Sequence, residues 1–527
     1  MPTRYLLNIC LLLSSSILPV FAQQQIPARE SKRPAPVLET YRLRYTGPRW
    51  SLLYGSYVGV EEFALNELQR IVQRFVPYIV EVRPSSEPAD EEKNLILVGT
   101  RANNRLIAEL AAKGLVPLPS APQGYTIACV PSPWKQGFKV AVIAGTDASS
   151  VLYGVVEFSK RLAKIPAETP DKKRVAFDQM AEFKVTESPV IESRGLWTWG
   201  YVIYDYRRFL DNMARLKMNK LVIWNDVPPV NSKRLIEYAH SRGVKIVYGF
   251  HWGWGIDNLD PASKEHLQEI NNQVLEKYER DYRHLGLDGI YFQSFLETRE
   301  TMAGGRTLAS LACVWTNEIG GALLGRHPDL RIEAGVEATS ILQNYGDLKP
   351  LDPRIEIMWD DAGVLPWSYD TVLDFPKGQG PQGLSTFEET LAYAKKLATL
   401  RPGKEFLMIA KGWMTLRWGT EFEHHGPFIL GERDRPFVRS RMVERSPRWD
   451  LVDAGWMRLY PHALRFFREV RSATPAPMTV IGLIEDGLFE ERIQPSAALL
   501  GEMLWNPHRV ASDYWELAMN PYYRLDH

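Results

Sequence analysis

Residues 194–226 read RGLWTWGYVIYDYRRFLDNMARLKMNKLVIWND. An apolar run at residues 194–199 is followed by apolar residues at helical spacing over residues 206–216, and a second apolar run follows at residues 220–225. Short apolar runs that alternate with helical segments are typical of parallel strands joined by covering helices. This stretch therefore predicts one strand–helix–strand unit of a parallel α/β fold.

The same unit recurs toward the end of the chain. Further helices are expected over residues 232–241, 264–284 and 308–324. Further strands are expected over residues 245–251, 288–295, 331–336, 355–359, 406–411 and 478–484. With the first two strands these make eight, the number that closes a parallel barrel. A doubly wound open sheet is disfavoured because no Gly-rich phosphate-binding turn follows the first strand. The sequence thus predicts a (β/α)₈ barrel, the TIM barrel.

A smaller domain precedes the predicted barrel. Its expected helices span residues 60–76, 101–113 and 148–162, and its expected strands span residues 94–99, 125–130 and 138–144. We expect a mixed α/β domain over residues 39–183 and the barrel domain over residues 186–527. Residues 23–38 are rich in proline and charge and are predicted to form a flexible leader.

The first 22 residues have the pattern of an export signal. Arg4 supplies the positive start, residues 5–20 are largely apolar, and residues 20–22 read VFA. The apolar run is short and three glutamines follow it, so no permanent membrane span is expected. The sequence predicts an exported protein, periplasmic or extracellular.

Charge and cysteine content narrow the functional classes. The chain has 63 Lys and Arg against 63 Asp and Glu and carries no long basic stripe, so nucleic acid is not an expected partner. Cys129 and Cys313 are the cysteines beyond the signal, and we expect them to be free and buried. Because zinc-type Cys or His spacing is missing, neither a metal nor a cofactor is expected. The oligomeric state stays open.

In a TIM barrel the active site lies at the carboxyl ends of the strands. In strand order these ends carry Trp197 and Trp199; Trp224, Asn225 and Asp226; His251, Trp252 and Trp254; Gln293 and Glu297; Glu337; Trp359, Asp360 and Asp361; Lys411 and Trp413; and Glu485, Asp486 and Glu490. Strands that end repeatedly in tryptophan plus a carboxylate or amide favour a pocket that stacks sugar rings and binds hydroxyls. Each tryptophan could instead belong to the core, and Asp226 or Asp361 could cap the next helix.

Several of these segments resemble glycoside hydrolases. Residues 194–196 (RGL), 209–219 (FLDNMARLKMN) and 222–226 (VIWND) resemble the first two barrel units of the β-hexosaminidases of family 20. Residues 357–361 (IMWDD) and residues 489–505 are similar to the sixth strand and the last strand–helix unit of that family. The front domain resembles the small α/β domain that precedes the barrel in family 20 and in the α-glucuronidases of family 67. The resemblance implies a TIM barrel and sugar chemistry.

The fourth strand departs from the hexosaminidase pattern. Hexosaminidases end this strand in Asp-Glu, where the Asp orients the acetamido group of the substrate, but here Leu296 precedes Glu297. A leucine cannot orient an amide. The α-glucuronidases also carry an acid Glu after strand four and carboxylate bases on later strands, although this chain lacks their long C-terminal helical region. The resemblance to them implies Glu297 as the acid, Asp360 or Asp361 as the base, and inversion.

Glycoside hydrolysis typically requires one protonated carboxyl and one ionised carboxylate. Phe292, Phe295 and Leu296 precede Glu297 in the sequence, and such apolar neighbours favour its protonated form. The alternative role for Glu297 is to cap a helix or to form an ion pair. Arg194, by resemblance, and Lys411 or Arg417 are candidate anchors for a hydroxyl or a uronate carboxylate. Their alternatives are a buried ion pair for Arg194 and surface charges for the other two.

These observations predict an exo-acting glycoside hydrolase that cleaves terminal sugars, with uronates among the candidates, from oligo- or polysaccharides. The expected substrate-binding residues are Arg194, Trp199, Trp224, Asn225, His251, Trp252, Trp254, Gln293, Trp359, Lys411, Trp413 and Glu490. The alternatives are a β-N-acetylhexosaminidase-like enzyme, a carbohydrate-binding barrel without catalysis, and a metal-dependent hydrolase.

Overall fold

The computed structural model describes residues 47–87, 93–166, 169–225, 227–249, 252, 258–296, 298–360, 384, 386–413, 427–484 and 488–525. The signal peptide expected at residues 1–22 and the leader expected at residues 23–38 lie outside these residues. Of the predicted site, Glu297, Asp361, His251 and Trp254 also lie outside them, as does the side chain of Lys411. Asp226, Arg417, Glu485 and Asp486, also named as strand-end or anchor candidates, lie outside them too. The other predicted site residues can be placed in the fold.

The front domain is built on a six-stranded sheet with the order β2–β1–β3–β5–β4–β6. Its strands are β1 (Trp50–Tyr54), β2 (Glu81–Pro84), β3 (Asn94–Thr100), β4 (Tyr125–Pro131), β5 (Lys139–Gly145) and β6 (Phe183–Glu187). β1, β2, β3 and β5 run parallel, whereas β4 is antiparallel to both of its neighbours. Because β6 pairs with β4, the sheet continues beyond the expected end of this domain at residue 183.

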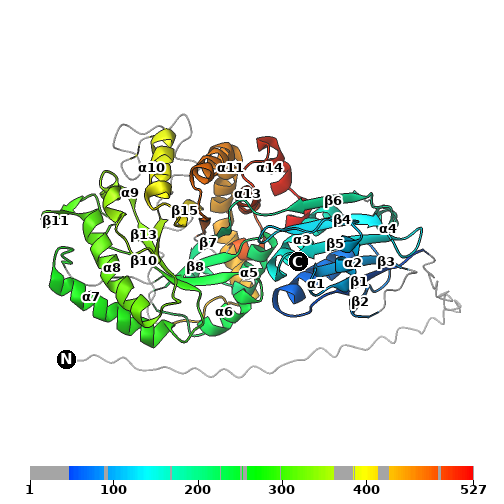
Figure 1. Ribbon diagram of the computed structural model, residues 1–527, viewed down its shortest axis with the longest axis horizontal. Helices are drawn as coiled ribbons and strands as arrows, with labels where there is room; N and C mark the ends of the chain where they lie inside the picture. Colours follow the sequence, from blue (N-terminus) through cyan, green and yellow to red (C-terminus); the bar gives the residue numbers. More distant parts are fainter. Residues whose placement is uncertain are drawn as a thin grey trace, which may run out of the picture. The chain divides into compact units, whose positions relative to one another are not determined.

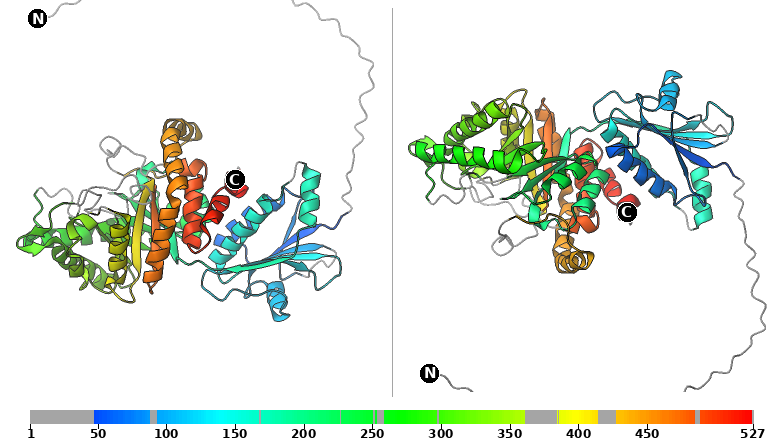
Figure 2. Two further views of the ribbon diagram at one scale, coloured as in Figure 1. Left: turned by 90° about the horizontal axis from the view of Figure 1, so that it is seen from above. Right: turned by 90° about the horizontal axis from the view of Figure 1, so that it is seen from below.

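Helices cover both faces of this sheet (Figures 1 and 2). They are α1 (Gly59–Val72), α2 (Arg105–Ala112), α3 (Ala148–Ala163) and α4 (Pro170–Asp178). Leu106 and Leu110 of α2 pack on one face, and apolar side chains of α1 and α3 pack on the other. The Asn104 side chain caps the start of α2, and Asp147 forms a capping box with Ser150 at the start of α3.

Eight parallel strands close into a barrel in the order β7–β8–β9–β10–β13–β14–β15–β16 (Figure 1). They are β7 (Ser193–Trp199), β8 (Lys220–Trp224), β9 (Lys245–Gly249), β10 (Gly289–Gln293), β13 (Ile332–Val336), β14 (Ile355–Trp359), β15 (Phe406–Trp413) and β16 (Met478–Ile484). The last strand pairs with the first, with Thr479 opposite Ser193. The predicted TIM barrel behind a small α/β domain is confirmed.

Helices follow most of the barrel strands. The longer ones are α5 (Tyr206–Arg215), α6 (Ser232–His240), α7 (Lys264–Lys277), α8 (Leu308–Arg326), α10 (Phe387–Leu400), α11 (Arg435–Ala473), α13 (Pro495–Trp505) and α14 (Ala511–Ala518). The short elements are η1 (Gly200–Val202), η2 (Tyr278–Tyr282), β11 (Met302–Ala303), β12 (Arg306–Thr307), α9 (Ala338–Ile341), η3 (Tyr345–Leu348), α12 (Leu488–Glu491) and η5 (Pro521–Arg524). Between β13 and β14 the connection contains α9 and η3 in place of a long helix.

The inside of the barrel is a packed core. Its apolar members are Trp197, Val222, Trp224, Val247, Tyr291, Met358, Leu407, Ile409, Ile481 and Leu483, with Trp199 packed against them. Because side chains alternate along a strand, the residues between these point outward and pack under the helices. The interior residue type changes along the strands, from the buried Lys220–Glu333 ion pair near the amino ends to aromatic side chains near the carboxyl ends.

Buried charges join the front domain to the barrel. Lys160 of α3 donates to Glu502 of α13 at 2.5 Å and to Glu157 at 2.9 Å. Lys217, which follows α5, donates to Glu157 at 2.5 Å. Burial raises the pKa of Glu502, but the ammonium groups of Lys160 and Lys217 outweigh burial and hold that pKa well below its ordinary value. The two domains therefore share one set of mutually compensating charges.

Two further expectations concern cysteines and membranes. Cys129 and Cys313 are free and buried, as predicted. Among the described helices, none combines the length and hydropathy that a membrane-crossing segment needs.

Candidate functional site

Strand alternation decides which strand-end residues face the inside of the barrel. Trp197, Tyr291 and Met358 belong to the interior core, so the residues two positions further along the same strands continue on the interior side. Those residues are Trp199, Gln293 and Asp360. Trp199 and Gln293 are partly exposed, whereas Asp360 is buried. The carboxyl ends of β7, β10 and β14 thus bring together an indole, an amide and a carboxylate.

An aromatic layer that includes Trp199 lies directly below Gln293 and Asp360. The rings of Trp197 and Trp199 meet edge to face with centroids 4.9 Å apart. Trp224 lies 6.1 Å from Trp199 and 5.8 Å from Tyr291, again with steep angles between the ring planes. Such edge-to-face pairs hold each other in fixed orientations. The layer gives the barrel mouth a rigid apolar floor, and Trp199 is its partly exposed member.

Asp360 directly follows β14 and is held from two sides. Its backbone amide donates to the carbonyl of Val336 at 3.1 Å. The Tyr291 hydroxyl donates to its carboxylate at 2.9 Å, and both side chains are almost fully buried. A buried carboxylate with a fixed donor has a defined orientation, which is the property that a catalytic base or nucleophile needs.

Two glycines make room for the aromatic layer. A Cβ added at Gly249 would lie 2.5 Å from Cε3 of Trp224 and 3.2 Å from Cδ1 of Tyr291. A Cβ added at Gly335 would lie 2.5 Å from the hydroxyl oxygen of Tyr291 and 2.9 Å from Cγ of Gln293. Distances below 3.0 Å cannot be accommodated without movement, so the small residues on β9 and β13 are required by the large ones on β8 and β10.

Several buried polar groups near the carboxyl strand ends have no hydrogen-bond partner among the described residues, and Asn225 and Trp197 carry two of them. Asn225 follows β8, is fully buried, and neither atom of its side-chain amide has a hydrogen-bond partner among the described residues. The indole nitrogen of Trp197 is also buried and without a partner within the described part of the chain. Buried polar groups are nearly always hydrogen-bonded, because leaving one unsatisfied costs about 1–3 kcal/mol. These groups favour a ligand that brings its own donors and acceptors.

The structure places Arg194 away from the strand ends, contrary to the role expected for it. It is the second residue of β7, at the amino end, and its guanidinium is fully buried. The guanidinium donates to the carbonyls of Ile191 and Lys217 and to the side chain of Gln123, and it lies over the ring of Trp505. These contacts tie the barrel to the front domain, so Arg194 has a structural role.

Three predicted tryptophans pack in the core outside the barrel. Trp252 stacks on Phe292 with centroids 3.4 Å apart, and Trp413 stacks on Trp456 with centroids 4.0 Å apart. Trp359 alternates with the interior side chains of β14 and is fully buried among outward-facing residues. The structure therefore does not bring these three rings to the barrel mouth. They match the alternative expectation, that a strand-end tryptophan belongs to the core.

Glu490 binds backbone groups of the segment before α5. Its two carboxylate oxygens accept hydrogen bonds from the backbone amides of Tyr204 at 2.7 Å and Asp205 at 2.6 Å. Its carbonyl accepts from the Arg208 side chain at 3.1 Å. The residue is fully buried and fixes the segment that leads into α5.

The flanks of Glu297 are described although Glu297 itself is not. Phe295 meets Trp315 edge to face with centroids 5.1 Å apart. The carbonyl of Leu296 accepts from the Ser340 hydroxyl at 2.7 Å, and the Leu296 side chain is buried. The chain that leads to Glu297 is thus anchored by an apolar contact and by a hydrogen bond to α9.

Sequence reasoning missed Tyr291 and gave no role to Glu337. Tyr291 precedes Gln293 by two positions, so strand alternation could have placed both on the interior side. Glu337 follows β13 and is buried, and it stands two positions after Gly335 on the interior side of that strand. The contact between Tyr291 and Asp360 had no signal in the sequence, because the two residues lie on strands that are separated by β13 in the barrel.

Residues 79–161, within the front domain, match the outer domain of the S-layer like family. No curated protein matches the chain. Among solved structures it is similar to BtGH115A, a family GH115 4-O-methyl-α-glucuronidase with specificity for decorated arabinogalactans, with 15% identity and a TM-score of 0.49 over 90% of this chain and 58% of that one. CpGH84B is 13% identical with a TM-score of 0.47, covering 89% of this chain and 70% of the other.

The β-N-acetylhexosaminidase from Bacteroides fragilis NCTC 9343 is 11% identical, with a TM-score of 0.43 and 88% of each chain covered. BtGH115A is considerably longer than this chain, which spans 58% of it.

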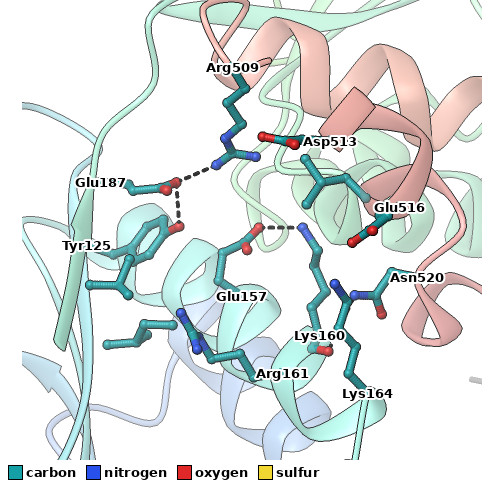
Figure 3. Close-up of a pocket in the computed structure, with 13 residues that line it drawn as sticks. Tyr125, Glu157, Lys160, Arg161, Lys164, Glu187, Arg509, Asp513, Glu516 and Asn520 are labelled. Atoms are coloured by element: carbon teal, nitrogen blue, oxygen red, sulfur yellow. Dashed lines mark hydrogen bonds and ion pairs between the residues drawn. The ribbon is translucent and has the colours of Figure 1, made fainter. Parts of the chain in front are cut away.

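A second group of polar residues lines a pocket of about 370 Å³ where β4, β6 and α3 meet α14 (Figure 3). The Glu187 carboxylate accepts from the Tyr125 hydroxyl at 3.0 Å and from Arg509 at 2.8 Å. Glu157 and Lys160, which also line it, pair at 2.9 Å. The charges that face this pocket largely compensate each other, so it belongs to the junction between the domains.

A cluster of charges occupies the amino-terminal end of the barrel. Arg331 bridges Glu333 at 2.9 Å, Glu356 at 2.6 Å and Glu405 at 3.0 Å, and Lys220 pairs with Glu333. Burial raises the pKa of Glu356 to about 7, with Arg331 opposing the rise and the other two carboxylates adding to it. This end of a TIM barrel generally serves stability rather than catalysis.

Within the described ranges, no three His, Cys, Asp or Glu side chains are grouped so as to hold a metal ion.

Proposed function

We propose that this chain is an exo-acting glycoside hydrolase that removes terminal sugars from oligo- or polysaccharides at the carboxyl-terminal mouth of its barrel. The observation that carries the proposal is the combination of an oriented, buried Asp360 with an aromatic floor. A sugar presents apolar C–H faces to aromatic rings and hydroxyls to polar groups, which is the ligand chemistry that this mouth suits.

The unsatisfied groups beside the site support the same ligand class. Asn225 offers one amide donor group and one acceptor, and Trp197 offers an indole donor, without partners among the described residues. Gln293 is a further amide on the interior side and is partly exposed. A hydroxyl can donate and accept at once, so a polyhydroxylated ligand can satisfy all of these groups, whereas an apolar ligand would leave them unpaired.

For the mechanism we assign Glu297 as the general acid and Asp360 or Asp361 as the base that activates water. In the sequence Glu297 follows β10 and the Asp pair follows β14, and β13 separates these two strands in the barrel. We therefore propose that the acid and the base act from the same end of the barrel. Carboxyls about 6.5–9.5 Å apart leave room for a water and invert, whereas about 5–5.5 Å gives retention. We favour inversion, by analogy with the α-glucuronidases that the sequence resembles.

For the substrate we propose a uronate ahead of N-acetylglucosamine. The residue before Glu297 is Leu296, whose side chain is buried in the core and cannot orient an acetamido group. Lys411 lies near the end of β15 and Arg417 follows that strand in the sequence, and these are the cations that we assign to a carboxylate. We further propose that residues 1–22 direct export, so that the enzyme meets its polysaccharide in the periplasm or outside the cell.

The test is turnover of a panel of aryl glycosides that includes paired glucuronide, glucoside and N-acetylglucosaminide substrates. We expect wild type to release the aryl group, and Glu297→Gln to lose about 10²–10⁴-fold in kcat while still binding the product sugar. Glu300→Gln is the matched control, because Glu300 is exposed and lies three residues further along the chain.

Two outcomes would contradict the proposal. Sugar binding without turnover of any substrate would favour a carbohydrate-binding barrel. Fastest turnover of the N-acetylglucosaminide would favour a hexosaminidase-like enzyme and would remove the argument from Leu296.

A further inference from the structure

We infer that Tyr291 is the positioning residue that holds the Asp360 carboxylate in its working orientation. The inference rests on the proposed function, because it assigns Asp360 a part in glycoside cleavage. Tyr291 lies below the strand ends and its hydroxyl is engaged by Asp360, so it acts through Asp360 and does not contact the substrate.

The hydrogen bond joins strands that are not neighbours. Tyr291 lies on β10 and Asp360 follows β14, and β13 runs between them in the barrel. The hydroxyl nevertheless lies 2.9 Å from Oδ2 of Asp360. It passes over Gly335, where any side chain would place a Cβ 2.5 Å from the hydroxyl oxygen. A glycine at this position of β13 is therefore what lets the tyrosine reach the carboxylate.

The ring of Tyr291 has little freedom to move. Its centroid lies 5.8 Å from that of Trp224 at an angle of 70° between the planes. On the same side, a Cβ at Gly249 would lie 3.2 Å from Cδ1 of Tyr291, so the ring rests against the backbone of β9. A ring packed between two strands aims its hydroxyl in one direction, and the carboxylate that accepts from it is aimed as well.

The chemical consequence concerns the two oxygens of Asp360. Oδ2 accepts from Tyr291, and this bond sets the plane of the carboxylate and the direction of Oδ1. A base must point a lone pair at the water that it deprotonates, and a nucleophile must point one at the anomeric carbon. Without the phenol the carboxylate loses this restraint on rotation about its Cβ–Cγ bond, and the fraction of reactive orientations falls.

The experiment compares Tyr291→Phe with wild type in the full chain. The ring stays and only the hydroxyl is lost. We expect kcat on the best aryl glycoside to fall about 10- to 100-fold, the scale of a hydrogen bond to a charged group. KM should stay within about twofold, because binding contacts are kept. In the Asp360→Asn background the same substitution should change the residual rate by less than about twofold, since a residue that acts only through Asp360 has nothing left to position.

Tyr248→Phe is the matched control. Tyr248 is a buried tyrosine on β9 that faces outward and bonds to Ser232, so its loss of a hydroxyl should leave kcat unchanged. Wild-type kcat in Tyr291→Phe would overturn the inference, and so would an equal loss in both backgrounds. If wild type turns over no glycoside, the proposed function fails, and a crystal structure of Tyr291→Phe then decides. A rotated Asp360 carboxylate would support positioning by Tyr291, and an unchanged one would overturn it.

Discussion

Gly335 on β13 lies so close to Tyr291 that a side chain at this position would clash with the tyrosine. A Cβ there would lie 2.5 Å from the hydroxyl oxygen and 2.9 Å from Cζ of the ring. The same rule holds on β9, where a Cβ at Gly249 would lie 2.5 Å from the ring of Trp224. Near the carboxyl ends of the strands, β9 and β13 thus carry glycines where the neighbouring strands β8 and β10 carry large aromatic side chains.

The first prediction follows from this packing. Gly335→Ala should displace Tyr291, lower kcat at least as much as Tyr291→Phe, and lower the free energy of unfolding by about 1–3 kcal/mol through overpacking. Gly321→Ala is the control, because nothing lies within 4 Å of its added Cβ in α8. That change should raise stability by about 0.5–1 kcal/mol. Urea unfolding and steady-state kinetics measure both, and wild-type values for Gly335→Ala would contradict the packing argument.

Asp360→Asn should remove most turnover and leave the fold intact. The amide oxygen of asparagine can still accept from Tyr291, but it can neither take up a proton nor attack as a carboxylate. We expect kcat to fall about 10²–10⁴-fold at unchanged melting temperature. Asp329→Asn makes the same chemical change at an exposed site beyond α8 and should leave kcat unchanged. If Asp360→Asn turns over substrate as fast as wild type, then Asp361 is the better assignment for the catalytic base.

The charge cluster at the other end of the barrel should make stability depend on pH. The pKa of Glu356 is about 7 in the folded chain and near its ordinary value of 4.5 in the unfolded chain. The folded state therefore binds more protons between these values, so the contribution of Glu356 to stability is full below pH 4.5 and is lost as pH rises through 7. Glu356→Gln should melt at a higher temperature than wild type at pH 8, with the difference vanishing near pH 5. An equal difference at both pH values, read by scanning calorimetry, would refute this.

Removal of one carboxylate at the domain junction should be costly. Glu502 is fully buried and compensates Lys160 and Lys217, so Glu502→Gln leaves buried ammonium groups under-compensated. We expect the free energy of unfolding to fall by about 3–5 kcal/mol. Chemical denaturation followed by tryptophan fluorescence measures it, with the exposed Glu516→Gln as control. A loss below about 1 kcal/mol would mean that water compensates the charges.

The substrate charge can be tested with paired sugars. Arg417→Ala or Lys411→Ala should lower kcat/KM on a glucuronide. The loss should correspond to about 1.5–3 kcal/mol of transition-state stabilisation, and the rate on the matching glucoside should change little. Equal losses on both substrates would show that the cation does not bind the carboxylate.

Much of the fold could be predicted from the sequence. Every barrel strand was predicted, because a buried strand needs a short apolar run, and that requirement is local. The sequence analysis did not predict β1, β2 and β6. The edge strands β2 and β6 are short and partly exposed, whereas β1 is a buried strand of five residues between β2 and β3. For the site, the sequence predicted carboxylates and tryptophans at strand ends, and strand alternation places Trp199, Gln293 and Asp360 on the interior side of the barrel.

The sequence by itself determined the barrel, the domain in front of it and the strand ends at which a site could form. Hydrophobic periodicity is a local property, because it depends only on residues that are close together along the chain. Only the tertiary structure decided which strand-end side chains meet. In the structure Trp359 and Trp413 point outward from the barrel, and Arg194 lies at the amino end of β7. The tertiary structure also joins Tyr291 to Asp360 across Gly335. Such contacts depend on barrel closure and on the register between strands far apart in the chain, and no local pattern records either.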